Sequence, residues 1–114
     1  MAIAPGTYDM TIQRRSDHSV AIVLNNNSGT AINLTGFTVA AQVWDTTRST
    51  KYADWAVTYT DRTAGSFSIA LTDTQTATFS PNVLAYDVLL VDGSGLKEYY
   101  LEGKIFMSEG YTTT

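Results

Sequence analysis

The sequence contains no cysteine and only one histidine, His18. Without cysteine the chain can form neither a disulfide nor a thiolate metal site. A single imidazole adds little ligand capacity, and the carboxylates are spread along the chain rather than clustered as in a dedicated calcium loop. We therefore expect folding without a metal or a cofactor.

Charge is also scarce, because only 16% of the residues are charged, with 7 basic and 11 acidic side chains and a net charge of −4. The one basic pair is Arg14-Arg15. Nucleic acids and anionic membranes select broad basic surfaces, so neither is expected as a partner.

Long hydrophobic runs are missing as well. No stretch approaches the ~20 apolar residues of a membrane span. The opening residues 1–6 lack the basic region and the apolar run of a signal peptide. We expect a protein that is made and folded in a cytosol.

Short alternating runs fill the sequence instead, and 44% of the residues are apolar, enough for one core. The abundance of threonine, tyrosine and valine favours strands. Strand-like runs cover 7–13, 19–24, 37–44, 55–59, 66–71, 85–91 and 97–107. This spacing predicts an all-β fold over 1–114, a single immunoglobulin-like sandwich of about seven antiparallel strands, with loose tails at 1–6 and 109–114.

Turn signals separate these runs. Residues 25–29 (Asn-Asn-Asn-Ser-Gly) and 92–95 (Asp-Gly-Ser-Gly) tolerate the backbone angles of tight turns, and the second predicts a hairpin. Thr72 and Gln75 have the spacing of a capping box, which predicts one or two helical turns over 73–79.

The inward face of each run defines the expected core. Its members are Val20, Ile22, Val39, Val43, Ile69, Leu71, Tyr86, Val88, Leu90, Leu101 and Ile105. In the first run Tyr8, Met10 and Ile12 share one face, and in the last run Tyr99 shares the face of Leu101. Tyr86 is either a simple core aromatic or a tyrosine corner, since it stands two residues before a core position after a helical crossing.

Catalysis is not expected. Asp17, His18 and Ser19 are contiguous, but neighbours on an extended chain point to opposite faces and cannot converge as a triad. His18 is interpreted as a surface residue at a strand start. The aspartates fall at strand ends and turns, where they satisfy backbone donors, and no spacing selects a carboxylate pair for glycosidase chemistry.

The most unusual stretch is 44–55, which reads WDTTRSTKYADW. Trp44 and Trp55 could pack against each other across a hairpin. Alternatively, Trp44, Arg48, Tyr52 and Trp55 form an interface with another protein, because these residue types dominate interface hot spots. Sugar stacking on the same aromatics is the third possibility. Tyr100 and Phe106 could extend such a patch.

Several motifs together resemble a phage family. They are Tyr8-Asp-Met-Thr-Ile12, Arg14-Arg-Ser-Asp17, Ile32-Asn-Leu-Thr-Gly36, Ile69-Ala-Leu-Thr72, Tyr86-Asp-Val-Leu-Leu90 and Leu101-Glu-Gly-Lys-Ile105. Across nearly the whole chain the pattern looks like the immunoglobulin-like N-terminal domain of tailed-phage baseplate upper proteins, and it is similar to small structural proteins of cyanophages. Ser16 departs from the pattern, since such domains often have glycine there, and baseplate upper proteins continue into further domains.

This resemblance implies a non-enzymatic virion component of the tail, baseplate or capsid surface, made in the host cytoplasm. It implies other virion structural proteins as partners, with copies of the chain itself possible among them. The alternative is an adhesion module that binds host-surface polysaccharide through Trp44, Tyr52 and Trp55.

Overall fold

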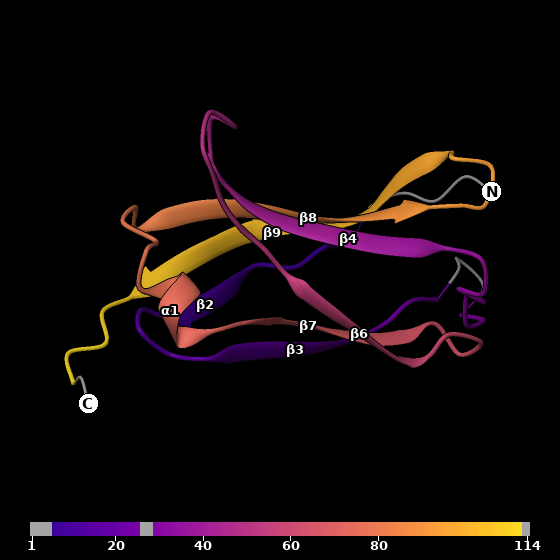
Figure 1. The fold of residues 1–114 in the computed structure, drawn as a ribbon, viewed down its shortest axis with the longest axis horizontal. Helices are drawn as coiled ribbons and strands as arrows, with labels where there is room; N and C mark the ends of the chain where they lie inside the picture. Colours follow the sequence, from indigo (N-terminus) through magenta and orange to yellow (C-terminus); the bar gives the residue numbers. More distant parts are fainter. Residues whose placement is uncertain (1–5, 26–28, 113–114) are drawn as a thin grey trace.

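Alternating buried and exposed side chains arrange the chain into two β-sheets that pack face to face (Figure 1). The structure is a computed structural model that describes residues 6–25 and 29–112. The larger sheet contains β1 (Gly6–Thr7), β2 (Met10–Gln13), β4 (Thr38–Asp45), β5 (Lys51–Asp54), β8 (Val83–Val91) and β9 (Lys97–Ser108). The smaller sheet contains β3 (His18–Val23), β6 (Ala56–Asp61) and β7 (Ser66–Leu71). A short helix, α1 (Asp73–Thr76), lies between β7 and β8.

The order of the strands is that of an immunoglobulin fold. The smaller sheet runs β3-β7-β6 and the larger runs β9-β8-β4-β5, with β1 and β2 both on the far side of β9. These correspond to the B-E-D and G-F-C-C′ arrangements of immunoglobulin domains. The predicted all-β sandwich with one short helix is therefore confirmed, with nine strands in the described residues because 7–13 divides into two and 51–54 forms an additional strand.

One feature of the pairing differs from the expected antiparallel arrangement. β1 and β2 run parallel to β9, with Met10 opposite Ile105. Between these strands the main chain of Tyr8 passes so close to Gly103 that a Cβ added there would lie 2.0 Å from the Tyr8 carbonyl oxygen. Tyr8, expected inward, is 51% exposed because β1 ends before it and β2 begins after it.

The position of the Tyr8 main chain also decides between the two interpretations of Tyr86. Its hydroxyl donates a hydrogen bond to the carbonyl of Tyr8, which is 78 residues away in sequence. A tyrosine corner would instead bond to the backbone a few residues upstream. Tyr86 is thus a core aromatic that fastens the opening strand, and its burial raises the pKa of the phenol.

The predicted core lies between the two sheets. Nine of the eleven predicted residues are buried, while Val20 and Leu101 are partly buried and pack against them. The predicted capping box is also present, since the Thr72 side chain accepts from the Gln75 amide and the Gln75 side chain accepts from the Thr72 amide. The helix ends at Thr76, earlier than the expected 79, and no helix within 6–25 and 29–112 is long and apolar enough to cross a membrane.

In β9 the expected phase is wrong at its start. Tyr100 is buried and Tyr99 is 52% exposed, the reverse of the prediction. The pairing of β8 with β9 shifts register between Val88 and Leu89, so Tyr100 is the extra residue of a bulge. The Tyr100 hydroxyl donates to the Asn25 carbonyl, which gives the buried ring a polar partner.

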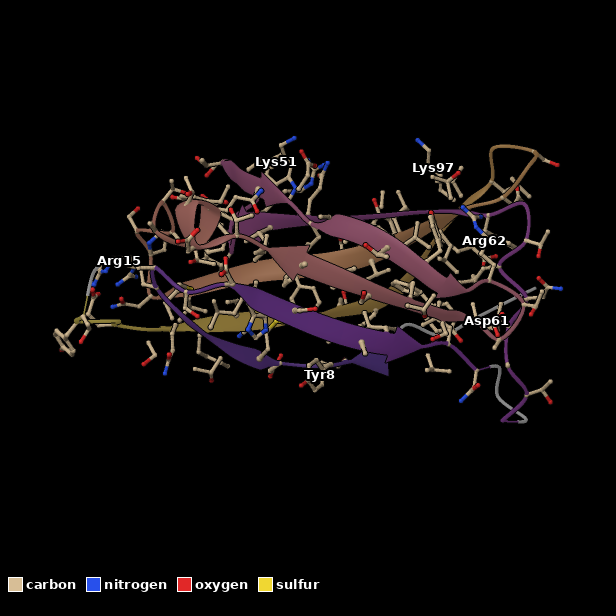
Figure 2. All side chains as sticks on the ribbon, turned by 60° about the horizontal axis from the view of Figure 1, so that its bottom comes forward. Tyr8, Arg15, Lys51, Asp61, Arg62 and Lys97 are labelled. Atoms are coloured by element: carbon tan, nitrogen blue, oxygen red, sulfur yellow. The ribbon has the colours of Figure 1, made fainter. Side chains whose placement is uncertain are left out.

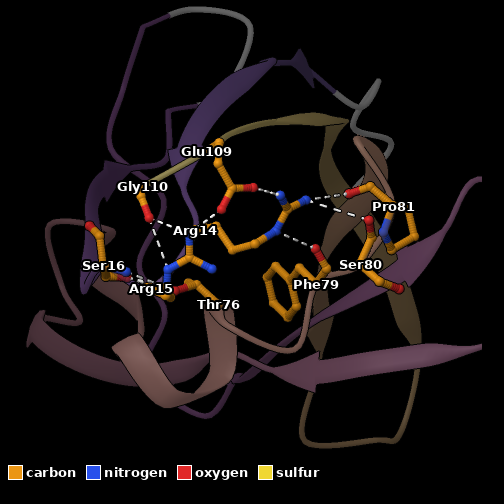
Figure 3. Close-up of polar contacts among 9 residues, drawn as sticks. All are labelled: Arg14, Arg15, Ser16, Thr76, Phe79, Ser80, Pro81, Glu109 and Gly110. Carbon is orange, nitrogen blue, oxygen red and sulfur yellow. Dashed lines mark hydrogen bonds and ion pairs between the residues drawn. The ribbon is translucent and has the colours of Figure 1, made fainter. Parts of the chain in front are cut away.

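The Arg14-Arg15 pair works as a structural clamp at one end of the sandwich (Figure 3). Arg14 donates to the carbonyl of Phe79 at 2.9 Å and forms an ion pair with Glu109. Arg15, in a left-handed conformation with φ of 67°, also pairs with Glu109 and donates to the carbonyl of Gly110. Residues 109–110 of the expected tail are therefore held against the domain, and Gly6 at the other end pairs with Leu101. Residues 1–5 and 113–114 of the expected tails, like 26–28 of the predicted turn, lie outside the described residues.

Ser16, where the phage domains that the sequence resembles often have glycine, is part of the same end. Its amide donates to Thr76 Oγ1 at 3.1 Å, and that hydroxyl donates to the Ser16 carbonyl at 2.9 Å. Thr76 is fully buried at the end of α1. Arg15 supplies the positive φ of this turn, so the turn forms without glycine at position 16.

Candidate binding site

The outer face of the larger sheet carries a groove of about 620 Å³, which we call the outer groove. It lies over β4, β8 and β9, on the side facing away from the core. Three rows of side chains, each running across the three strands, make up half of its lining residues. The rows are Ala40-Leu89-Tyr99, Gln42-Asp87-Glu102 and Trp44-Ala85-Lys104.

The hollow shape follows from side-chain size. Ala40 and Ala85 are small and stand in different rows, so the sheet surface is low beside each. Larger side chains rise at the margins, including Trp44 on β4 and Phe106 on β9. Small side chains beside larger ones therefore leave this face of the sheet hollow.

The hairpin between β4 and β5 places Arg48 at one margin of the groove. Figure 1 shows this hairpin projecting beyond the body of the sandwich. The Arg48 guanidinium lies 4.6 Å from the centre of the Trp44 ring, in a cation–π contact. The Trp44 indole N–H donates to Gln42 at 2.9 Å, which fixes the ring over the sheet. Trp44 and Arg48 are thus held together on the groove.

Asp45 gives this hairpin its shape. Its carboxylate accepts hydrogen bonds from the amide of Ser49 at 2.7 Å and from the hydroxyl of Thr47 at 3.2 Å. Hydrogen bonds from Ser49, followed by those from Thr50 and Thr47, lower the pKa of Asp45. The turn holds Arg48 at a φ of 58°, a left-handed conformation that is unusual for a residue other than glycine.

Two carboxylates occupy the middle row. Asp87 lies directly opposite Glu102 on the neighbouring strand, and Gln42 lies opposite Asp87 on its other side. Burial and the neighbouring charge of Glu102 raise the pKa of Asp87, while the charge of Arg48 lowers it by a smaller amount. Like charges placed directly across a sheet destabilise it. The floor of the outer groove is therefore acidic and electrostatically strained.

Exposed aromatic side chains line the other margin. Tyr99 is 52% and Phe106 is 42% exposed, and both belong to β9. Figure 2 shows that, of the labelled charged residues, Arg15 lies toward one end of the sandwich and Asp61, Arg62 and Lys97 lie toward the other, whereas Lys51 lies between them. The outer groove thus combines exposed aromatic rings, one arginine and a pair of carboxylates over the middle of a sheet.

The four residues predicted for an interface do not lie together. Trp44 and Arg48 line the outer groove. Tyr52 packs edge-on against buried Phe79, with ring centres 6.0 Å apart. Trp55 is only 4% exposed, which removes it from any surface contact in the folded chain.

Trp55 is buried because it joins β5 of one sheet to β6 of the other and its ring fills the space between them. It contacts Tyr86 edge-on, with ring centres 6.1 Å apart, and lies 6.3 Å from His18. The two tryptophans therefore pack against different partners, one in the core and one outside. Tyr100, offered as an extension of the patch, is also in the core, whereas Phe106 does line the groove.

The Asp17-His18-Ser19 stretch does not form a triad. His18 is half-buried beside Trp55 rather than at the surface, and burial lowers its pKa. Asp17 accepts a hydrogen bond from the amide of Asp73 at 2.7 Å, so it caps the helix instead of orienting the imidazole. Among residues 6–25 and 29–112, no group of three or more potential metal ligands comes together.

Sequence reasoning missed Asp87, Glu102 and Tyr99 as members of one surface. The signal was present, because outward positions on two strands joined by the 92–95 turn must lie side by side. The bulge at Tyr100 concealed this signal, since the bulge changes which residue of β9 faces outward.

In comparisons with known proteins, no family model and no curated protein matches this chain.

Proposed function

We propose that this chain is a non-enzymatic structural component of a tailed-phage virion that assembles by docking the outer groove onto another virion protein. The observation that carries the docking part is that one concave face has the Trp44–Arg48 stack at one margin and exposed Tyr99 and Phe106 at the other. The family resemblance described above supports the virion setting.

The chemistry of this face favours a protein partner. Tryptophan, tyrosine and arginine contribute most of the binding energy in protein interfaces, above all near the centre of the contact. The conformations of Trp44 and Arg48 are already restricted by the Trp44–Gln42 hydrogen bond and by the Asp45 turn, so less side-chain entropy is lost on binding. The face therefore has both anchor residues and a prepared geometry.

A polysaccharide ligand is the second candidate. Sugars also stack on exposed aromatic rings, and Gln42, Asp87 and Glu102 offer hydrogen-bonding groups between the margins of the groove. Since Trp55 is buried, fluorescence from Trp44 would report such binding. A saturable change in emission on adding host-surface polysaccharide, absent in Trp44→Phe, would favour adhesion over assembly.

Particle incorporation tests the assembly proposal. The double variant Trp44→Ala/Arg48→Ala should be depleted at least tenfold from purified virions, because truncating an anchor costs ~2 kcal/mol or more. The matched control is Tyr111→Ala/Lys51→Ala, which removes an exposed aromatic residue and an exposed cation outside the groove. Circular dichroism of each purified protein monitors the fold.

The results separate the readings. Depletion of the first variant with normal incorporation of the control supports docking through the outer groove. Full incorporation of a folded Trp44→Ala/Arg48→Ala protein would remove this face from the interface. A wild-type protein that is absent from purified particles would overturn the virion role altogether.

A further inference from the structure

The middle row of the outer groove restricts what can cover it. Asp87 and Glu102 face each other across β8 and β9, and burial already penalises the ionised form of Asp87. A partner that excludes water from the groove would remove more of their hydration. Buried carboxylates without a compensating cation are strongly unfavourable, so an uncharged protein surface is a poor fit.

The chain's own cations do not fully supply that compensation. Arg48 reduces the strain on Asp87, but its guanidinium is stacked on Trp44 at the margin. Lys104 stands one row away, and its amide donates to the Asp9 carboxylate at 2.8 Å, which brings another negative charge to the same side. The floor therefore retains an excess of negative charge.

A second copy of the chain does not complement this floor. In a two-fold interface the same patch meets itself, which would bring two Asp87–Glu102 pairs toward each other. The net charge of −4 adds to that repulsion. A partner segment with a basic side chain complements both the charge of the floor and the apolar side chains of Leu89 and Tyr99 in the neighbouring row.

We infer, on the basis of the proposed docking function, that the partner is a protein segment that inserts a lysine or arginine side chain between Asp87 and Glu102. The cation lies between the two carboxylates and the aliphatic stem packs against Leu89 and Tyr99. Long basic side chains combine an apolar stem with a charged head, which matches an acidic floor beside apolar walls. This assigns to the groove a specificity for basic peptide segments.

Binding of single-residue probes to the ¹⁵N-labelled chain tests the inference by NMR. The probes are N-acetyl-arginine methylamide and N-acetyl-citrulline methylamide, which have nearly the same shape but differ in charge. We expect the arginine probe to shift the amides of Gln42, Asp87 and Glu102 with an affinity at least fivefold above that of the citrulline probe.

Variants tie this preference to the two carboxylates. Asp87→Asn/Glu102→Gln should lose the fivefold difference in affinity. Glu98→Gln removes one carboxylate charge from β9 outside the groove and should keep the difference. If the double variant does not give a folded spectrum, Glu102→Gln alone should reduce the difference at least twofold. Glu102 is exposed, so this single change leaves the core intact.

Three results would overturn the inference: equal affinity for the two probes, shifts centred outside the groove, or groove shifts that depend on protein concentration alone and so reveal a second copy as the occupant. Failure here is distinguishable from failure of the docking proposal. If Trp44→Ala/Arg48→Ala is depleted from virions while Asp87→Asn/Glu102→Gln is incorporated normally, docking stands and the basic-segment specificity falls.

Discussion

Replacing Thr76 with valine should be strongly destabilising although the two side chains have nearly the same shape. Thr76 is fully buried, and its hydroxyl accepts from the Ser16 amide at 3.1 Å and donates to the Ser16 carbonyl at 2.9 Å. Thr76→Val leaves the amide and the carbonyl of Ser16 without their hydroxyl partner (Figure 3). The carbonyl of Asp73, which the hydroxyl also approaches, keeps its bond from the amide of Ala77.

The magnitude follows from these two lost partners. Each buried polar group left unpaired costs about 1–3 kcal/mol. Ser16 is half-buried, so we take the lower half of that range for each group and expect a loss of about 2–4 kcal/mol in the free energy of unfolding. An unfolding entropy of about 2.1 cal/mol/K per residue then predicts a fall in Tm of about 8–17 °C for 114 residues.

Urea denaturation and thermal melts followed by circular dichroism measure both quantities. Thr74→Val is the matched control, since Thr74 is an exposed residue of the same helix and its change should stay within about 0.5 kcal/mol. Thr76→Ser keeps the hydroxyl and should recover most of the loss. A Thr76→Val protein within 1 kcal/mol of wild type, or a Thr74→Val protein equally destabilised, would refute the role given to this hydroxyl.

Three further predictions concern charge and packing. Asp87→Asn should raise the free energy of unfolding at pH 7. The folded pKa of Asp87 lies above 3.8, so the ionised carboxylate destabilises the folded state. This destabilisation disappears as the pH falls through the folded pKa. The advantage should vanish in urea titrations at low pH, and an equal effect at both pH values would contradict the electrostatic cause. Glu109→Gln should lower Tm at pH 7, because hydrogen bonds from Arg15 and then Arg14 hold the Glu109 pKa below 4.5. The stability contributed by Glu109 is present above the unfolded pKa and is lost as the pH falls through the folded pKa. Thermal melts of the wild type and of Glu109→Gln should therefore converge in strong acid. Val88→Ala should cost about 1–3 kcal/mol in urea denaturation because Val88 is fully buried, whereas Val23→Ala at a 60% exposed position should cost far less.

Local patterns in the sequence predicted much of the sandwich. Alternation identified the inward face of most strands, because a side-chain period of two allows only one face to enter the core. The capping box was recognised because both of its hydrogen bonds form within four consecutive residues, Thr72 to Gln75. These features depend on neighbours in sequence, which single-chain reasoning can evaluate.

Features that depend on distant partners were missed. Counting back from the 92–95 turn places Leu101 opposite Asp87, whereas the bulge at Tyr100 places Glu102 there. Trp55 is predicted for an interface from its residue type, yet its position between the two sheets buries it. Of the four residues predicted for an interface, Trp44 and Arg48 line the outer groove, while the acidic floor depends on the register of β8 and β9.

The parallel pairing of β2 with β9 also sets an order in time. Asp9 and Lys104, which are hydrogen-bonded at this junction, are 95 residues apart. At a synthesis rate of roughly 5–20 residues per second, the partner of β2 is made about 5–20 s later. During that interval Met10 and Ile12 lack the β9 residues with which they pair in the folded chain. Because so distant a contact closes the larger sheet, the docking of the opening strand is expected to be the late, slow event of folding.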